Sequence, residues 1–291
     1  MYLDRRRFLA LAATPAIPVP LDLDVPFIVT PDNAVLKMLD LAQVSSGDHV
    51  LDLGSGDGRI VITAALRYGA SASGVEVDPA LVERARSNAL KAGVASRTNF
   101  EVRDLFATDL SRASVITMYL LPDVNIQLRP ALLQLRPGTR LISHDWDMGD
   151  WSADQQATVD APDKTIGLLK KAKLMLWIVP ANVDGLHRGQ IEQRAEQRVE
   201  PQGDGIELKI VQRYQQISMA SLQFGGRTLH ALPAPVLGPS VTLHGADEAG
   251  KRFRLSASVR QQPTVPAAGA IRWRLLIDGE PQREIATQLV R

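Results

Sequence analysis

The residues of this sequence best suited to ligand chemistry lie in the stretch VLDLGSGDGRI, residues 50–60. Gly54, Gly56 and Gly58 alternate directly after an apolar run that has the pattern of a buried strand. Glycine adopts positive φ angles and lets a ligand approach the backbone, and a helix that begins after such a turn presents unpaired N–H groups. A strand, a glycine turn and a helix in this order therefore predict a nucleotide-binding site.

The spacing of the glycines distinguishes between nucleotide ligands. Dinucleotide binding requires G-x-G-x-x-G, but position 59 is Arg59 and the third glycine is Gly58. A P-loop would require Gly-Lys-Ser/Thr after a longer loop. The segment instead resembles the hydrophobic-Asp-hydrophobic-Gly-x-Gly-x-Gly motif of class I methyltransferases, which use S-adenosylmethionine (SAM). That resemblance implies SAM as the cofactor, with a binding site that includes Asp52, Gly54, Ser55, Gly56 and Gly58.

Two acidic residues follow the glycines at offsets that suit this cofactor. Glu76 ends the next predicted strand, about 20 residues past the glycines, which is the offset expected of a ribose-binding acid. Asp104 follows the third predicted strand, where the resembled family places an acid or amide near the adenine amino group. Each acid also has a structural interpretation, a solvated strand end for Glu76 and a helix cap for Asp104.

Candidate catalytic residues follow the fourth and fifth predicted strands, at the edge of the sheet where ligands bind in such folds. Tyr119 could present a ring face and a hydroxyl to an amine, and His144 and Asp145 could accept or relay a proton. The structural alternatives are a packed aromatic for Tyr119 and loop caps for the other two. No second histidine or paired carboxylate stands at ligand spacing from His144, so we expect no metal.

An alternation of strand and helix patterns positions these residues between Thr30 and Trp151. The strand patterns are separated by helix-length connections and cover residues 50–53, 73–77, 100–102, 114–119 and 139–143. Such alternation implies parallel βαβ units with right-handed crossovers. We expect Thr30 to cap the first helix, with Pro31 at its first position. The predicted fold class is α/β, with a doubly wound, mostly parallel Rossmann-like sheet.

After residue 151 the alternation of strand and helix patterns ends, and from residue 206 onward the pattern is one of short alternating strands. Stretches such as IRWRL (271–275) predict half-buried antiparallel strands, so we expect a small β sandwich or barrel. The lysine-rich stretch 164–173 is expected to be a solvated face. The predicted organisation is an N-terminal segment (1–25), a methyltransferase domain (26–180), a polar linker (181–205) and a β-rich C-terminal domain (206–291).

The N-terminal segment carries RRRFL (5–9) followed by ALAA, which resembles a twin-arginine export signal. The alternative is a basic helix ended by Pro15. Because SAM is a cytoplasmic metabolite, we expect an uncleaved segment and a cytoplasmic protein. Association with the inner membrane through the N-terminus and export are the alternatives.

Further motifs indicate a smaller group of relatives within this class, and the resemblance to that group covers residues 26–151. The chain is similar there to the mitochondrial lysine methyltransferases whose targets are the c-type subunit of ATP synthase and the adenine nucleotide translocase, and to bacterial relatives, in PFIVTP (26–31), DLGSGDGRIVI (52–62), YLLP (119–122) and SHDW (143–146). The resemblance implies that Thr30 lies near the methionine end of the cofactor. After the fourth strand, relatives that methylate amino groups often carry the motif Asn/Asp-Pro-Pro-Tyr. Residues 119–122 lack the polar first residue of this motif, which argues against an amide or base nitrogen as the methyl acceptor.

The amino-acid composition limits which partners and which chemistry are expected. The 33 Lys and Arg against 32 Asp and Glu give no argument for nucleic acid as a partner, and the absence of Cys excludes disulfides and thiolate catalysis. We expect a SAM-dependent N-methyltransferase that acts by in-line transfer on a protein lysine, with membrane proteins among the expected acceptors. The alternatives are a small-molecule methyltransferase and a non-catalytic SAM-binding protein whose β domain is an interaction module.

Overall fold

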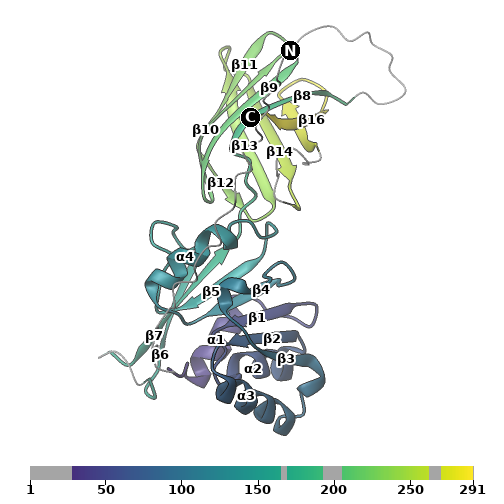
Figure 1. The fold of residues 1–291 in the computed structure, drawn as a ribbon. Helices are drawn as coiled ribbons and strands as arrows, with labels where there is room; N and C mark the ends of the chain where they lie inside the picture. Colours follow the sequence, from purple (N-terminus) through teal and green to yellow (C-terminus); the bar gives the residue numbers. More distant parts are fainter. Residues whose placement is uncertain (1–27, 165–168, 193–204, 262–269, 291) are drawn as a thin grey trace, which may run out of the picture.

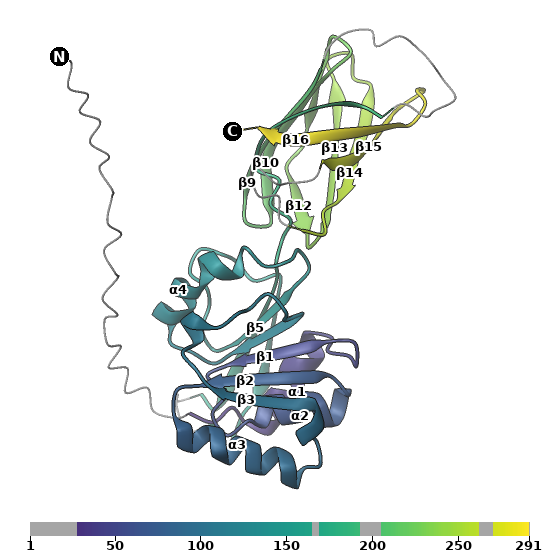
Figure 2. The ribbon, with the colours of Figure 1, turned by 45° about the vertical axis from the view of Figure 1, so that its right-hand side comes forward.

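The computed structural model describes residues 28–164, 169–192, 205–261 and 270–290. The chain forms an α/β domain followed by an antiparallel β barrel, and both views show the barrel joined to the α/β domain at one of its ends (Figure 1, Figure 2). The predicted export-like segment lies outside the described residues. Among the helices of the described ranges, none is long and apolar enough to cross a membrane.

Seven strands form the sheet of the first domain, in the order β3-β2-β1-β4-β5-β7-β6. The first five are parallel, and β7 runs antiparallel to β5 and to β6. This arrangement confirms the predicted doubly wound sheet and adds an antiparallel hairpin at one edge. The strands are β1 His49–Leu53, β2 Ser71–Glu76, β3 Thr98–Val102, β4 Val115–Met118, β5 Arg140–His144, β6 Gln155–Asp160 and β7 Lys171–Ile178.

Helices cover both faces of this sheet because the side chains of each strand alternate between two apolar layers. Val50 and Val115 pack with the first three helices, and Leu51 and Ile116 pack with the fourth. The helices are α1 Asp32–Leu41, α2 Arg59–Tyr68, α3 Pro79–Lys91 and α4 Pro122–Leu132, with short 3-10 turns η1 Ala95–Arg97 and η2 Leu105–Ala107.

The start of α1 differs from the prediction. Pro31 is the N-cap residue, and no side chain caps the helix. The Thr30 hydroxyl instead lies 3.2 Å from Nδ1 of the buried His144. A hydroxyl that is buried needs a partner, and the histidine of β5 provides one that a solvent-facing cap would not.

The second domain is a closed barrel, which resolves the choice between sandwich and barrel. Its sheet has the order β11-β10-β12-β13-β14-β15-β16-β8-β9, and pairing of β9 with β10 closes it. Alternate residues such as Leu208, Leu255 and Trp273 fill its interior. The strands are β8 Gly185–Ile191, β9 Ile206–Arg213, β10 Gln216–Phe224, β11 Arg227–Ala231, β12 Ala234–Leu237, β13 Ser240–Asp247, β14 Arg252–Ser258, β15 Ile271–Ile277 and β16 Arg283–Val290.

The stretch expected as a linker contributes a strand to this barrel. Residues 185–191 form β8, which pairs with β16 and β9, and residues 193–204 lie outside the described ranges. Gly185 and Gly189 interrupt the alternation of apolar residues from which this strand could have been predicted. A Cβ at Gly189 would lie 1.9 Å from the carbonyl oxygen of Ala286, so only glycine fits the close approach of the two strands.

Candidate active site

The glycine turn lies between β1 and α2. Gly54, Gly56 and Gly58 all have positive φ angles, of 76°, 51° and 81°, which explains their alternate spacing. The amides of Gly54 and Ser55 both donate to the carbonyl oxygen of Val75, over 2.9 and 3.0 Å. These bonds fold the turn over the end of β2, so that the next residue of that strand comes to lie beside the turn.

That next residue is Glu76, the predicted ribose-binding acid. Its Oε2 accepts from the amide of Gly56 over 3.0 Å, and its Oε1 accepts from the amides of Val77 and Asp78 over 2.8 and 3.2 Å. The structure therefore brings Glu76 and the glycine turn together, and backbone amides fix the carboxylate. Its contact with ribose stays a prediction.

Asp52 lies beneath the turn and is buried. Burial raises its pKa to about 8, and the negative charges of Glu76 and Asp57 add to the shift, against the lowering effect of a 2.6 Å hydrogen bond from Thr117. A cationic ligand above this carboxyl group would favour its ionised form. Sequence reasoning missed Thr117, which the pairing of β1 with β4 places directly beside Asp52.

Arg59 connects the turn to the segment before α1. Its Nη2 pairs with Oδ2 of the buried Asp57 at 2.7 Å, and its Nη1 donates to the carbonyl oxygen of Thr30 over 3.0 Å. Burial raises the pKa of Asp57, but the hydrogen bonds and charge of Arg59 outweigh that effect and lower it. Sequence reasoning used Arg59 only to exclude a dinucleotide site, yet this residue holds Thr30 against the turn.

Asp104 caps a short helix, which was the structural interpretation of this residue. Its Oδ1 accepts from the amide of Phe106 over 2.8 Å and caps η2, and the residue is exposed. It follows β3, which neighbours β2 in the sheet, so the position relative to Glu76 is as expected. An adenine contact by Asp104 stays a prediction.

The three candidate catalytic residues meet at the carboxyl ends of β4 and β5. The Tyr119 hydroxyl donates to Oδ2 of Asp145 over 3.2 Å, and the rings of Tyr119 and His144 lie 3.9 Å apart between centroids. Asp145 has a φ of 63°, an unusual backbone conformation for a residue with a side chain, which turns the chain directly after β5. Nε2 of His144 is buried with no hydrogen-bond partner in the described part of the chain.

A buried lysine completes this cluster. The Lys164 ammonium forms an ion pair with Oδ2 of Asp145 and donates to the carbonyl oxygen of Lys171 over 2.7 Å. Its side chain is only 7% exposed, so the prediction of a solvated lysine face is wrong at this position, although it holds for the exposed Lys171. No local signal identified Lys164, because a neighbour 19 residues away supplies its counter-charge.

The charges of the cluster follow from this packing. Burial lowers the pKa of His144 and keeps its ring neutral. Burial raises the pKa of Tyr119, with a further rise from the charge of Asp145, so the phenol keeps its proton. Burial alone would raise the pKa of Asp145, but the hydrogen bond from Lys164 leads the effects that lower it. The site thus combines the hydroxyl donor of Tyr119 with a carboxylate that is paired with Lys164.

Comparisons with known proteins match the α/β domain. A family model described as the ANTKMT methyltransferase domain matches residues 52–155. The chain is 41% identical over 138 residues to a protein-lysine N-methyltransferase of Saccharolobus islandicus, an alignment that covers 47% of this chain and 86% of that protein.

Two eukaryotic relatives match the same domain. The chain is 37% identical over 131 residues to the lysine N-methyltransferase of Xenopus laevis that is named for the c-type subunit of ATP synthase, with 45% of this chain and 56% of that protein covered. It is 36% identical over 135 residues to the adenine nucleotide translocase lysine N-methyltransferase of Mus musculus, with 46% and 58% covered. The chain thus spans little more than half the length of these two relatives.

Among solved structures, an RNA methyltransferase from Salinibacter ruber in complex with S-adenosyl-L-homocysteine is similar. It shares 46% identity, with 54% of this chain and 96% of that chain covered, at a TM-score of 0.48.

The glycine turn, the seven-stranded sheet and these sequence relatives define a class I SAM-dependent methyltransferase. Within that class, the chain belongs to the family described by the ANTKMT methyltransferase domain. The barrel lies outside the matched residues.

The residues around the turn fit SAM. Gly54 is exposed at the turn, and the hydroxyl of Ser55 is buried without a hydrogen-bond partner in the described residues, so this hydroxyl is available to a ligand. The carboxyl groups of Asp52 and Glu76 provide acceptors for a cationic ligand that carries hydroxyls. Glu76, Asp52 and the turn would hold the cofactor, and Thr30 would lie between it and the catalytic cluster.

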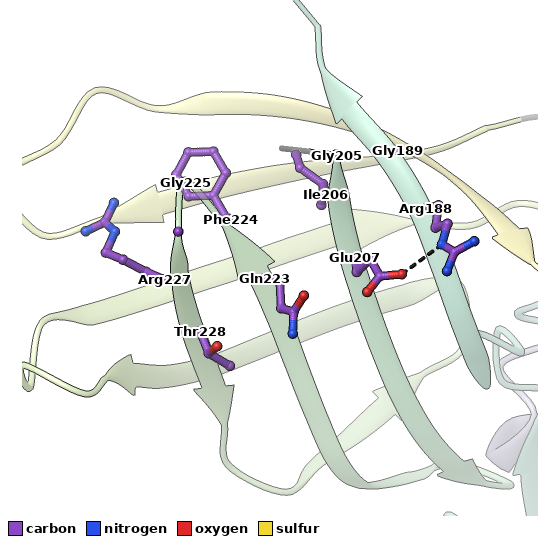
Figure 3. Close-up of a pocket in the computed structure, with 11 residues that line it drawn as sticks. Arg188, Gly189, Gly205, Ile206, Glu207, Gln223, Phe224, Gly225, Arg227 and Thr228 are labelled. Atoms are coloured by element: carbon purple, nitrogen blue, oxygen red, sulfur yellow. Dashed lines mark hydrogen bonds and ion pairs between the residues drawn. The ribbon is translucent and has the colours of Figure 1, made fainter. Parts of the chain in front are cut away.

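The barrel carries a separate hollow of about 550 Å³, lined by residues of β8 to β11 (Figure 3). Arg188 and Glu207 form a 2.8 Å ion pair in its wall. The hollow includes Phe224 at the end of β10, whereas Gln215, directly before β10, contacts the α/β domain at Trp151 and Ser152. It is therefore not part of the candidate active site.

Proposed function

We propose that this methyltransferase transfers the methyl group of SAM to the side-chain amine of a protein lysine. The observation that carries the proposal is that Asp145, which also accepts from the Tyr119 hydroxyl, already holds a lysine ammonium, that of Lys164. A partly buried carboxylate and a neutral hydroxyl at the ligand-binding edge of the sheet are the groups that an acceptor lysine needs for its orientation.

The names of the relatives support this acceptor. The relative from Saccharolobus islandicus, of which the chain covers 86%, is a protein-lysine N-methyltransferase, and the names of the two eukaryotic relatives give lysines of ATP synthase and of the adenine nucleotide translocase as their substrates. The segment after β4 begins with Tyr119 and offers no side-chain amide, which further favours an aliphatic amine over a planar nitrogen. We propose a cytoplasmic site of action, where SAM is made.

SAM supplies a methyl group that its sulfonium already activates, so the protein has mainly to align the acceptor and exclude water. Correct positioning alone accounts for about 7–11 kcal/mol of the barrier in such reactions. Asp145 attracts the acceptor ammonium, and the Tyr119 hydroxyl orients it. The ammonium must lose a proton to solvent before the amine can take the methyl group, and S-adenosylhomocysteine is the leaving group. Because burial makes His144 a weak base, we assign this residue the positioning of Thr30 and Tyr119 rather than proton storage.

The test uses purified protein and SAM labelled in its methyl group. The acceptor source is lysate and membranes from cells of the source organism that lack this gene, and the products are separated into protein, nucleic-acid and low-mass fractions. We expect label in protein and methyllysine after acid hydrolysis. Transfer should be lost in Glu76→Ala and retained in Glu101→Ala, a substitution of a partly exposed acid on β3. Label confined to nucleic acid or to small molecules would overturn the proposal.

A further inference from the structure

The barrel touches the α/β domain through the turn between β9 and β10. Arg213 and Gln216 are the last paired residues of the two strands, so Tyr214 and Gln215 form a two-residue turn. This turn reaches the loop of residues 145–152 that follows β5 and begins at Asp145. We propose that Tyr214 and Gln215 position this loop for the methyl acceptor, which makes the barrel part of the active-site architecture. The inference rests on the proposed function.

Gln215 makes the buried part of the contact. Its Oε1 accepts from Nε1 of Trp151 over 2.9 Å, and its Nε2 donates to the carbonyl oxygen of Ser152 over 2.7 Å. Trp151 is fully buried and Gln215 is 8% exposed. Both polar groups would lack partners if the turn were displaced, and each buried group left unsatisfied costs about 1–3 kcal/mol. The glutamine therefore fixes the distal end of the loop.

Tyr214 makes the second part of the contact. Its ring stacks on Trp151 with 5.8 Å between centroids and 21° between planes, and its hydroxyl donates to Asp150 over 2.9 Å. Arg213 forms an ion pair with the same carboxylate. Arg129 of α4 also pairs with Asp150 and lies over the Tyr214 ring, 5.6 Å from its centroid. Barrel, loop and α4 thus meet around one tyrosine.

The near end of the same loop lies in the catalytic cluster. After Asp145, the carbonyl oxygens of Trp146 and Asp147 accept from Nδ2 of the buried Asn125, both over 3.2 Å. Trp146 is 42% exposed, which is unusual for the largest apolar side chain and suits an apolar wall of an acceptor channel. Five residues separate Asp145 from Trp151, so the barrel contact lies close along the chain to the carboxylate that we propose for the acceptor.

The turn residues themselves indicate a role other than turn formation. Two-residue hairpin turns require a positive φ at the first central residue, which favours Gly, Asn or Asp there. Tyr214 nevertheless adopts a φ of 52°. At the other end of β10, Gly225 and Gly226 occupy the equivalent two-residue turn, and a Cβ there would meet nothing within 4 Å. Of these two turns, the chain thus accepts backbone strain only at the one that contacts the loop.

This contrast supplies the test and its matched control. Tyr214→Asn with Gln215→Gly installs the favoured turn sequence, which keeps the hairpin but removes every side-chain contact of the two residues. Gly225→Asn installs the same Asn-Gly turn at the far end of β10. Tyr214→Phe keeps the stacked ring and loses only the hydrogen bond to Asp150. Each full-length variant is measured for SAM affinity by calorimetry and for transfer of labelled methyl into the protein fraction of the lysate described above.

We expect the double variant to keep its SAM affinity and to lose at least about 90% of the transfer rate at saturating SAM, which corresponds to about 1.4 kcal/mol. Gly225→Asn should match the wild type, and Tyr214→Phe should retain at least half of the rate. An unchanged rate in the double variant would overturn the inference, and so would a parallel loss of SAM affinity, which would indicate a general stabilising contact. Absence of protein label with the wild type would instead refute the proposed function.

Discussion

The ammonium of Lys164 and the carboxylate of Asp145 form an ion pair at the carboxyl end of β5, where their side chains are 7% and 17% exposed. The Tyr119 hydroxyl donates to the same carboxylate oxygen. The chain's own lysine thus occupies the kind of position that we propose for the acceptor amine, and an acceptor lysine would share or replace this partner.

Removal of the Lys164 charge tests how much the pair contributes to stability. Lys164→Met leaves Asp145 without its counter-charge in a largely buried site, and breaking such a pair costs about 3 kcal/mol. Lys171→Met is the matched control, because Lys171 belongs to an exposed pair with Asp160 and its loss should cost less than about 1 kcal/mol. Urea unfolding of both variants measures the difference, and equal midpoints would contradict the burial of the pair.

The raised pKa of Asp52, about 8, predicts proton release when SAM binds. In the free protein the carboxyl group is protonated below pH 8, and a cationic ligand stabilises the carboxylate and lowers that pKa. SAM affinity should therefore rise with pH up to about 8 and level off above it. Calorimetry at pH 7 in buffers of different ionisation enthalpy measures the protons released.

An isosteric variant provides the control for this linkage. Asp52→Asn cannot ionise, so its binding enthalpy should not depend on the buffer, and its SAM affinity should be flat with pH. A binding enthalpy that does not depend on the buffer in the wild type as well would show that SAM binding does not change the protonation of Asp52.

Glu76→Ala should weaken SAM binding at least about tenfold. The carboxylate is held by three backbone amides beside the turn, and hydrogen bonds between a carboxylate and ribose hydroxyls contribute about 1.5–3 kcal/mol. Titration calorimetry gives the affinity, with Glu101→Ala on the neighbouring strand as the control. Equal affinities in the two variants would remove Glu76 from the site.

Much of the fold and half of the site were predictable, because both depend on local patterns. The glycine turn, Glu76 and the edge that carries Tyr119, His144 and Asp145 follow from strand–helix alternation, since the carboxyl ends of parallel strands must share one edge. The structure also places the last three residues in contact with one another.

The remaining features depend on contacts between distant segments. Thr117 meets Asp52 through strand register, and Lys164 meets Asp145 through the return of the β6–β7 hairpin. Thr30 does not cap α1 as expected, because its hydroxyl lies against the buried His144 instead. Strand β8 was not predicted because it contains Gly189, which the close approach of β16 requires. A local sequence pattern does not show that approach.

The pH dependence of transfer tests the charge states of the cluster. Burial lowers the pKa of His144 and raises that of Tyr119, so neither group changes its charge between about pH 6 and 9. At saturating SAM the rate should rise about tenfold per pH unit over this range, as the acceptor ammonium loses its proton. An inflection near pH 6.5 that disappears in His144→Gln would instead identify His144 as a titrating catalytic base.

The central claim is the identity of the atom that receives the methyl group. Tandem mass spectrometry of the labelled protein fraction, after reaction with the wild type or with Glu76→Ala, locates that atom directly. We predict methyl groups on lysine side-chain nitrogens, formed by the wild type and absent with the variant. Methyl groups on another side chain, or on no polypeptide at all while SAM binds normally, would contradict this claim.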